Sequence, residues 1–340
     1  MRLRSGVFGV LLTAGLVSST PVVASAADLP TSISVGDNPI SVAISPNGAH
    51  AYVTNAADRT VSVIDTASRT VTGTITVGTQ PQGIAFSPDG RTAYVTNAGD
   101  YDTGPGSVSV IDTATRAVVH TIAVAPLRLP QAVAVTPDGK RAYVVGYGYL
   151  SVIDTATNTA RAVDIGRTSA TDVEVTPDGS RVYIADFDSR SVVVVSTATD
   201  SVIDTVPLGS APNWLDIMPD GLRVYVTSLQ GNKVYMIATA GNYVGAAVDV
   251  PGAPFGVAAA PNGRKVHVTG HDAHTLTSID VATNTVAQTR RVGRHPISVA
   301  ITPNGADAYV ISRAGEYVSV VHIGTEASLY RPVRMPPRRR

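Results

Sequence analysis

The 340-residue sequence contains no cysteine, and this absence removes several kinds of chemistry at once. A disulfide framework, a thiolate metal site and a cysteine nucleophile are all excluded. Aromatic residues make up only 5% of the chain and include a single tryptophan, so a tryptophan-rich docking sequence for a quinone is absent too. Charged residues are scarce at 15%, against 44% hydrophobic residues, which is too little charge for a disordered chain. The sequence therefore predicts a folded protein that is stabilised by core packing.

The sequence also lacks an apolar run of the roughly 20 residues that a membrane-spanning helix needs. The apolar run at residues 7–17 is shorter, follows two arginines and precedes the small residues Ala-Ser-Ala at 24–26. This order is typical of a secretory signal peptide over residues 1–26. We therefore expect a mature protein that begins near Ala27, has no transmembrane segment, and is secreted, extracellular or associated with the cell envelope.

Positive charge is scarce in the body of the chain, although the formal net charge of the whole sequence is zero. Two arginines lie in the predicted signal peptide and five in the C-terminal segment YRPVRMPPRRR, so residues 27–330 carry 19 basic and 26 acidic groups. An acidic body argues against nucleic acid as a partner, because that affinity comes from neutralising phosphates. We expect residues 326–340 to form a basic disordered tail.

One pentapeptide recurs along the chain. AYVTN stands at residues 51–55 and 93–97, and near copies follow as AYVVG, VYIAD, VYVTS, VHVTG and AYVIS. Each copy follows a Pro-Asp-Gly or Pro-Asn-Gly turn, and the glycines of these turns are Gly48, Gly90, Gly139, Gly179, Gly221, Gly263 and Gly305. Four of the six spacings between these glycines are 42 residues. The chain is therefore predicted to contain seven copies of one unit.

Each unit contains four short runs with the length and composition of strands. In the first unit they span residues 40–45, 50–55, 60–66 and 70–78, and nothing between them has the 3.6-residue period of a helix. Seven four-stranded units at a period of about 40–45 residues are typical of a β-propeller. We therefore predict an all-β fold, a seven-bladed β-propeller of four-stranded antiparallel blades over residues 27–325.

The two ends of the repeat array predict how the ring closes. The last unit ends after its third strand at residues 316–323, whereas an additional strand at residues 31–36 precedes the first unit. Pairing this N-terminal strand with the C-terminal blade would close the ring and remove two exposed sheet edges.

The strings AYVTN, SPDGRTAYVTN and VSVIDTATRAVVHTIAV resemble the YVTN-family β-propeller repeat. This resemblance covers residues 31–325 and implies an exported bacterial protein or one similar to archaeal surface-layer proteins. The repeat carries no catalytic residue that could be transferred to this chain. Seven-bladed propellers of similar architecture also act as lactonases or as lyases on cyclic lactones, so the resemblance leaves an enzymatic activity open.

Aligning the seven inner strands by their turn proline shows where small residues give way to acidic or aromatic ones. Asp172 and Glu174 share one face of a strand, and Trp214 and Asp216 occupy the same positions on the neighbouring strand. Because propellers bind ligands where their inner strands begin, we also expect Gln82, Gln131 and Asn213 at the mouth of the channel. These seven residues are the candidate ligand or channel residues.

Two interpretations of the three carboxylates remain open. Asp172, Glu174 and Asp216 could hold a divalent cation such as Ca²⁺ or Mg²⁺ beside an aromatic wall for an organic ligand. They could instead line a water-filled channel or accept hydrogen bonds from the backbone of adjacent blades.

A second candidate metal site lies in the sequence GHDAHT of the sixth unit. His271, Asp272 and His274 are offered by one loop, and His295 by the next loop on the same face. Histidine and carboxylate ligands at such spacing can chelate a transition metal and leave a position open for water. The alternative is a polar loop with solvated histidines.

The motifs of common enzymes are missing: no G-x-S-x-G elbow, no glycine-rich phosphate loop and no H-E-x-x-H sequence occurs. The first hypothesis is therefore a monomeric binding or cell-envelope interaction scaffold, with a protein, a polysaccharide of the cell envelope or a small ligand as partner. The alternative is a lactonase-like or lyase-like enzyme in which Asp172, Glu174 and Asp216 hold the cation and His271 or His295 moves a proton.

Overall fold

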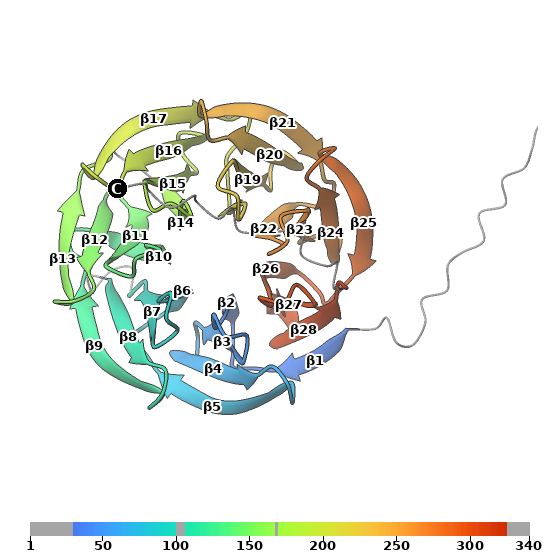
Figure 1. Cartoon of the computed structure of the whole chain (residues 1–340). Coiled ribbons are helices and arrows are strands. Elements are labelled where there is room, and N and C mark those ends of the chain that lie inside the picture. Colours follow the sequence, from blue (N-terminus) through green and yellow to red (C-terminus); the bar gives the residue numbers. More distant parts are fainter. Residues whose placement is uncertain (1–29, 100–105, 167–168, 325–340) are drawn as a thin grey trace, which may run out of the picture.

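The chain folds into a ring of seven four-stranded antiparallel sheets around a central axis, as Figure 1 shows. The structure is a computed structural model, and it describes residues 30–99, 106–166 and 169–324. In six sheets the strands follow one another in chain order from the axis outward as a simple meander, and in the seventh the outermost strand comes from the N-terminus. This confirms the predicted seven-bladed β-propeller.

The first four blades run in chain order around the ring. Blade 1 contains β2 (Pro39–Ile44), β3 (His50–Asn55), β4 (Thr60–Asp65) and β5 (Thr70–Thr76). Blade 2 contains β6 (Pro81–Phe86), β7 (Thr92–Asn97), β8 (Ser107–Asp112) and β9 (Ala117–Ala123). Blade 3 contains β10 (Arg128–Val135), β11 (Arg141–Tyr147), β12 (Leu150–Asp154) and β13 (Thr159–Val163). Blade 4 contains β14 (Ala170–Val175), β15 (Arg181–Asp186), β16 (Ser191–Ser196) and β17 (Ser201–Pro207).

The remaining three blades complete the ring. Blade 5 contains β18 (Leu215–Ile217), β19 (Arg223–Ser228), β20 (Lys233–Ala238) and β21 (Tyr243–Asp249). Blade 6 contains β22 (Pro254–Ala259), β23 (Lys265–Gly270), β24 (Thr275–Asp280) and β25 (Thr285–Arg291). Blade 7 contains β26 (Pro296–Ile301), β27 (Asp307–Ser312), the 3-10 helix η2 (Arg313–Gly315), β28 (Tyr317–His322) and, as its outer strand, β1 (Thr31–Ser34).

The N-terminal strand closes the ring, as the sequence predicts. β1 pairs antiparallel with β28, and Figure 1 shows these two strands, from opposite ends of the sequence colours, side by side. The side chain of Ile33 is only 5% exposed and belongs to one apolar cluster with Val318 and Val320. Closure therefore covers the last blade with apolar packing as well as backbone hydrogen bonds.

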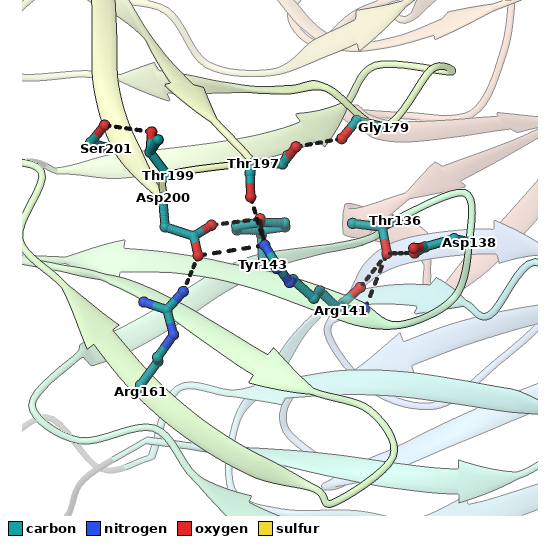
Figure 2. A network of polar contacts seen from close by, with 10 residues as sticks. All are labelled: Thr136, Asp138, Arg141, Tyr143, Arg161, Gly179, Thr197, Thr199, Asp200 and Ser201. Atoms are coloured by element: carbon teal, nitrogen blue, oxygen red, sulfur yellow. Dashed lines mark hydrogen bonds and ion pairs between the residues drawn. The ribbon is translucent and has the colours of Figure 1, made fainter.

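In several blades the tyrosine of the recurring pentapeptide bonds the blade that follows. The hydroxyl of Tyr183 in blade 4 donates a hydrogen bond of 2.7 Å to Asn242 in blade 5, and Tyr225 in blade 5 donates one of 2.8 Å to Asn284 in blade 6. Figure 2 shows the corresponding contact of Tyr143 with Asp200. The repeated tyrosine is thus a buried link between blades, which explains why the sequence repeats it.

Figure 2 also shows that charge strengthens the link between blades 3 and 4. Arg141 donates to the carbonyl of Thr197 at 2.6 Å, and its guanidinium lies 3.5 Å from the Asp200 carboxylate. Arg161 forms a second ion pair with the same carboxylate. Asp200 therefore fixes three side chains of the preceding blade.

The Pro-Asp-Gly and Pro-Asn-Gly turns join the inner strand to the second strand of each blade, as predicted. Gly48 has a φ of +73°, which a glycine adopts without steric cost. Its carbonyl accepts a hydrogen bond of 2.6 Å from the hydroxyl of Thr66 in the turn that joins β4 to β5. These two kinds of turn occupy one face of the ring, which we call the turn face.

Some sequence predictions concern residues that the structure does not describe. The signal peptide of residues 1–26 and the basic tail of residues 326–340 lie outside the described residues. No helix in the described part of the chain has the length and apolar character needed to cross a membrane.

Candidate functional site

The face opposite the turn face carries a pocket at the mouth of the central channel, which we call the mouth pocket. It has a volume of about 620 Å³. Each blade contributes one residue to its lining, at the position six residues before the turn proline. This position lies in the inner strand or directly before it, and its residues are Ile40, Gln82, Gln131, Thr171, Asn213, Phe255 and Ile297. The repeat therefore builds a ring of seven side chains of five kinds from one repeated position.

Irregular pairing in the inner strands accompanies this ring. In six blades the register between the inner strand and its neighbour shifts across this position, for example between Pro39 and Val42 in β2 and between Pro81 and Ile84 in β6. A bulge of this kind re-aims a side chain that regular alternation would send elsewhere. The bulges thus give both this position and the next one access to the channel.

The threonine of the pentapeptide fixes the backbone of the ring. Thr54 in blade 1 donates a 2.7 Å hydrogen bond to the carbonyl of Gln82 in blade 2, and Thr96 in blade 2 donates one of 3.0 Å to the carbonyl of Gln131 in blade 3. Thr227 in blade 5 makes the equivalent bond to the carbonyl of Phe255. Each of these ring residues is therefore held by the blade before it.

Loops between blades and loops within blades supply the rest of the mouth pocket. Asn38 and Gln80 come from loops that lead into inner strands, Phe187 follows β15, and Arg313 begins η2. Arg313 is the one charged side chain among the described lining residues, and its Nε donates to Asn38 at 2.9 Å. Apart from Arg313 and Thr171, the lining side chains are amide, aromatic or aliphatic.

The structure places the predicted residues Gln82, Gln131, Asn213 and Trp214 in this lining. The sequence analysis missed Phe255, although it stands in the same alignment column as the three amides. Reading that same column across all seven blades identifies it. Arg313 and Phe187 carry no comparable signal, because their loops differ from blade to blade.

A second cavity of about 340 Å³ lies inside the channel, and we call it the inner chamber. Asp172, Glu174 and Asp216 line it, together with Trp214 and the small residues that replace them in other blades. Gln131 and Trp214 line both cavities, so the inner chamber adjoins the mouth pocket. The structure therefore brings the seven predicted channel residues to two adjoining cavities.

Two of the three carboxylates hold the backbone of the next blade. Asp172 accepts a hydrogen bond of 2.9 Å from the backbone N–H of Leu215, and Asp216 accepts one of 2.7 Å from the N–H of Ala259. The hydroxyl of Ser298 accepts one of 3.4 Å from Val42 in the same manner. This geometry matches the interpretation in which inner-strand carboxylates accept backbone hydrogen bonds.

The inner chamber changes the acidity of these groups. Burial raises the pKa of Asp216 to about 6 and that of Asp172 well above its usual range. Burial, followed by the charges of Asp216 and Asp172, raises the pKa of Glu174 well above its usual range. The chamber therefore favours protonated carboxyl groups over three close negative charges.

A row of rings leads from the channel to the edge of the mouth. The ring centroids of Trp214 and Phe255 lie 5.1 Å apart, and those of Phe255 and His271 lie 6.0 Å apart. His271 is 4.7 Å from His295, which in turn is 4.8 Å from His274. Blades 5, 6 and 7 thus share one aromatic wall beside the mouth pocket.

At the end of this row, His271, Asp272 and His295 each bring one potential ligand atom within 4.8 Å of the others. Within the described ranges, this cluster does not include the channel carboxylates or His274. The Nδ1 atom of His274 lies 3.1 Å from the carbonyl of His271 and 3.1 Å from the backbone nitrogen of His295. The cluster therefore differs from the predicted trio of His271, Asp272 and His274, because the fold turns His274 toward the backbone.

Partial burial lowers the pKa of His295, and the neighbouring imidazoles of His271 and His274 lower it further. Its Nδ1 atom is buried and has no hydrogen-bond partner in the described part of the chain. The geometry thus favours a neutral ring at this position.

Comparison with known proteins bears on the fold more than on the site. The sequence model of one family, the Choice-of-anchor I domain, matches residues 13–128, about a third of the chain. No curated protein matches the sequence. The fold is similar to that of a solved structure titled "Kuenenia stuttgartiensis Hydrazine Synthase", with a TM-score of 0.77 and 24% sequence identity. The match covers 92% of this chain and 100% of the chain of that structure. At that identity the likeness extends to the fold alone, and the chain is a seven-bladed β-propeller.

Proposed function

We propose that this protein is an exported binding module of the cell envelope, and that its mouth pocket holds a short segment of a neutral polysaccharide. The observation that carries the proposal is the lining of the pocket. Three amide side chains, of Gln82, Gln131 and Asn213, line the same pocket as the aromatic rings of Trp214 and Phe255. A concave site of this kind, with apolar walls and a few convergent polar groups, is the usual form of a ligand site.

The chemistry of the lining suits hydroxyl-rich ligands. An amide side chain offers both donors and an acceptor, and a sugar hydroxyl can meet either. The faces of Trp214 and Phe255 supply flat apolar surface for the C–H groups of a sugar ring. The volume of about 620 Å³ lies within the usual range for sites that enclose ligands of modest size.

A neutral ligand fits the charges around the pocket better than an anion. Arg313 is already bonded to Asn38, and the inner chamber below contains Asp172, Glu174 and Asp216. Asp216, whose pKa is about 6, is ionised at neutral pH and would repel an anionic group that reached the chamber.

The predicted signal peptide and the resemblance to YVTN repeats both support an exported protein. The match to the Choice-of-anchor I domain supports the same proposal for the cell surface. Membership of the YVTN family and the envelope location remain part of the proposal.

The test is affinity electrophoresis of the mature protein in gels that contain neutral envelope polysaccharide and a metal chelator. We expect retardation by the polysaccharide, with a loss of at least tenfold in apparent affinity for both Trp214→Ala and Gln82→Ala. Tyr243→Ala is a suitable control, because Tyr243 is 59% exposed on the outer strand β21. Equal retardation of all variants would refute binding in the mouth pocket.

A further inference from the structure

We propose that His271, Asp272 and His295 form a binding site for a divalent transition metal of the zinc class, at the edge of the mouth pocket. The site lies in two loops, one between β23 and β24 and one between β25 and β26. It goes beyond the proposed polysaccharide binding, because it involves a different ligand and different residues.

The backbone around these side chains is fixed by hydrogen bonds. The N–H of His271 donates to the carbonyl of Ala253 at 3.0 Å, and the N–H of Asp272 donates to the carbonyl of Gly252 at 3.1 Å. The carbonyl of His295 accepts from the N–H of Arg313 at 3.3 Å. A preorganised loop pair of this kind needs only side-chain rotation to close the 4.8 Å cluster around an ion.

The unpartnered Nδ1 atom of His295 is the second observation that points to a ligand. A buried ring nitrogen without a partner is unfavourable, and native structures rarely contain one. The ring of His295 packs against that of His271 in a tilted contact, at 46° between the ring planes, and against that of His274 edge-on, at 83°, and these contacts hold the ring in place. Coordination of a metal by the cluster would allow the ring to adjust and satisfy its nitrogens.

The pairing of His271 with Asp272 has the form found in metal sites. Nδ1 of His271 lies 2.7 Å from Oδ1 of Asp272, which leaves the Nε2 lone pair of the neutral ring available for an ion. A carboxylate that orients a histidine in this way raises its basicity as a ligand. To serve as a ligand, Asp272 turns from Nδ1 of His271 to the ion, because one carboxylate cannot reach both Nδ1 and an ion held at Nε2 of the same ring.

The donor set indicates the class of metal. Two imidazoles and one carboxylate suit Zn²⁺, Co²⁺ or Ni²⁺, whereas Ca²⁺ and Mg²⁺ prefer an all-oxygen shell. Three protein ligands leave a fourth position open. The ring of His271 is 6.0 Å from that of Phe255, which lines the mouth pocket, so the metal site lies beside that pocket.

The test uses the mature, tag-free protein after treatment with a chelator. Addition of Co²⁺ should produce visible absorption bands that saturate at one equivalent, and calorimetry with Zn²⁺ should give the same stoichiometry. His271→Gln and His295→Gln should each weaken binding by about 10–100-fold, and Ca²⁺ or Mg²⁺ should not compete.

His322→Gln is the matched control. His322 also forms a histidine–aspartate pair, with Asp307 at 3.0 Å, but the described residues place it in no cluster of three ligands. This variant should bind Co²⁺ as the unaltered protein does. Melting curves in the presence of chelator confirm that each variant is folded.

Absence of saturable binding would overturn the proposal, and so would stoichiometric binding that survives both His271→Gln and His295→Gln. This readout is independent of the proposed function, because polysaccharide retardation is measured in chelator and metal binding is measured without polysaccharide.

Discussion

The two faces of the ring are built from the same repeat but differ in how much they vary. On the turn face, one threonine hydroxyl bonds the carbonyl of the turn glycine in blade after blade, at Thr66, Thr113, Thr155, Thr197 and Thr239. On the mouth face, the seven equivalent ring residues include two isoleucines, two glutamines, a threonine, an asparagine and a phenylalanine. A uniform face indicates architecture, whereas the varied face is where a ligand can be recognised.

The difference predicts separate effects on stability and on binding. Substitutions that break the links between blades should lower stability and leave the mouth pocket able to bind. Substitutions in the mouth pocket should weaken ligand binding and leave the free energy of unfolding nearly unchanged.

The largest expected effect is that of Tyr225→Ala on the links between blades. Tyr225 is fully buried, and its loss would leave a cavity and remove the bond to Asn284. We expect a loss of about 3–5 kcal/mol in the free energy of unfolding, measured by urea denaturation. Tyr225→Phe keeps the ring and should cost only about 0.5–1.5 kcal/mol. A similar cost for both variants would show that the hydroxyl, and not the packing, dominates.

The next effect concerns the inner chamber. Asp172→Ala leaves the buried N–H of Leu215 without its acceptor, and we expect a cost of about 1–3 kcal/mol. Asp172→Asn retains an oxygen acceptor and should be clearly more stable than Asp172→Ala in the same urea denaturation at pH 7. Equal stability of the two variants would contradict a structural role for this hydrogen bond.

A pH-dependent effect is expected at Glu174. Its pKa is raised in the folded protein by burial and by Asp216 and Asp172, so its contribution to stability falls as pH rises above the ordinary glutamate range. Asp216, whose pKa is about 6, adds to the same loss between about pH 4 and pH 6.

Glu174→Gln should therefore melt at the same temperature as the unaltered protein near pH 4, and at a higher temperature at pH 7 to 8. Thermal melts across this range measure the difference. A variant that is less stable at pH 8 would indicate that the folded protein uses the charged form of Glu174.

The smallest effect on stability is expected at the mouth pocket. Gln131 lies partly exposed in the ring, and its amide donates to the carbonyl of Leu129 at 3.2 Å. Gln131→Ala should change the free energy of unfolding by no more than about 0.5 kcal/mol in urea denaturation, as surface substitutions usually do. A loss comparable to that of Tyr225→Ala would remove the distinction between the two faces.

The sequence was sufficient to predict the fold because every level of the repeat agrees. The turn glycines, the alternating strands and the additional N-terminal strand all indicate one closed ring, and β1 pairs with β28 as expected. Local signals that point to the same structure leave few alternatives.

The site was only partly predictable, and the reason is geometric. Alternation along the inner strands correctly groups Asp172 with Glu174 beside Trp214 and Asp216. Alternation alone does not predict the bulges at this position, which give Phe255 and the equivalent residues of other blades access to the mouth pocket.

The histidine cluster was harder for a different reason. Spacing along the chain groups His271 with Asp272 and His274. It offers His295, 24 positions away, from the next loop on the same face, but does not show that His295 rather than His274 meets His271 and Asp272. Contacts between loops of neighbouring blades depend on the conformation of each loop, which no repeat position specifies.

The most direct test of the central claim uses the fluorescence of Trp214, the single tryptophan of the chain, which lies in the mouth pocket. Neutral oligosaccharides released from envelope polysaccharide are titrated into the mature protein and into the Gln82→Ala and Tyr225→Phe variants. We expect a saturable spectral change that Gln82→Ala weakens at least tenfold and Tyr225→Phe leaves intact. Binding detected by calorimetry without any change at Trp214, or a loss in Tyr225→Phe equal to that in Gln82→Ala, would contradict a ligand site on the mouth face.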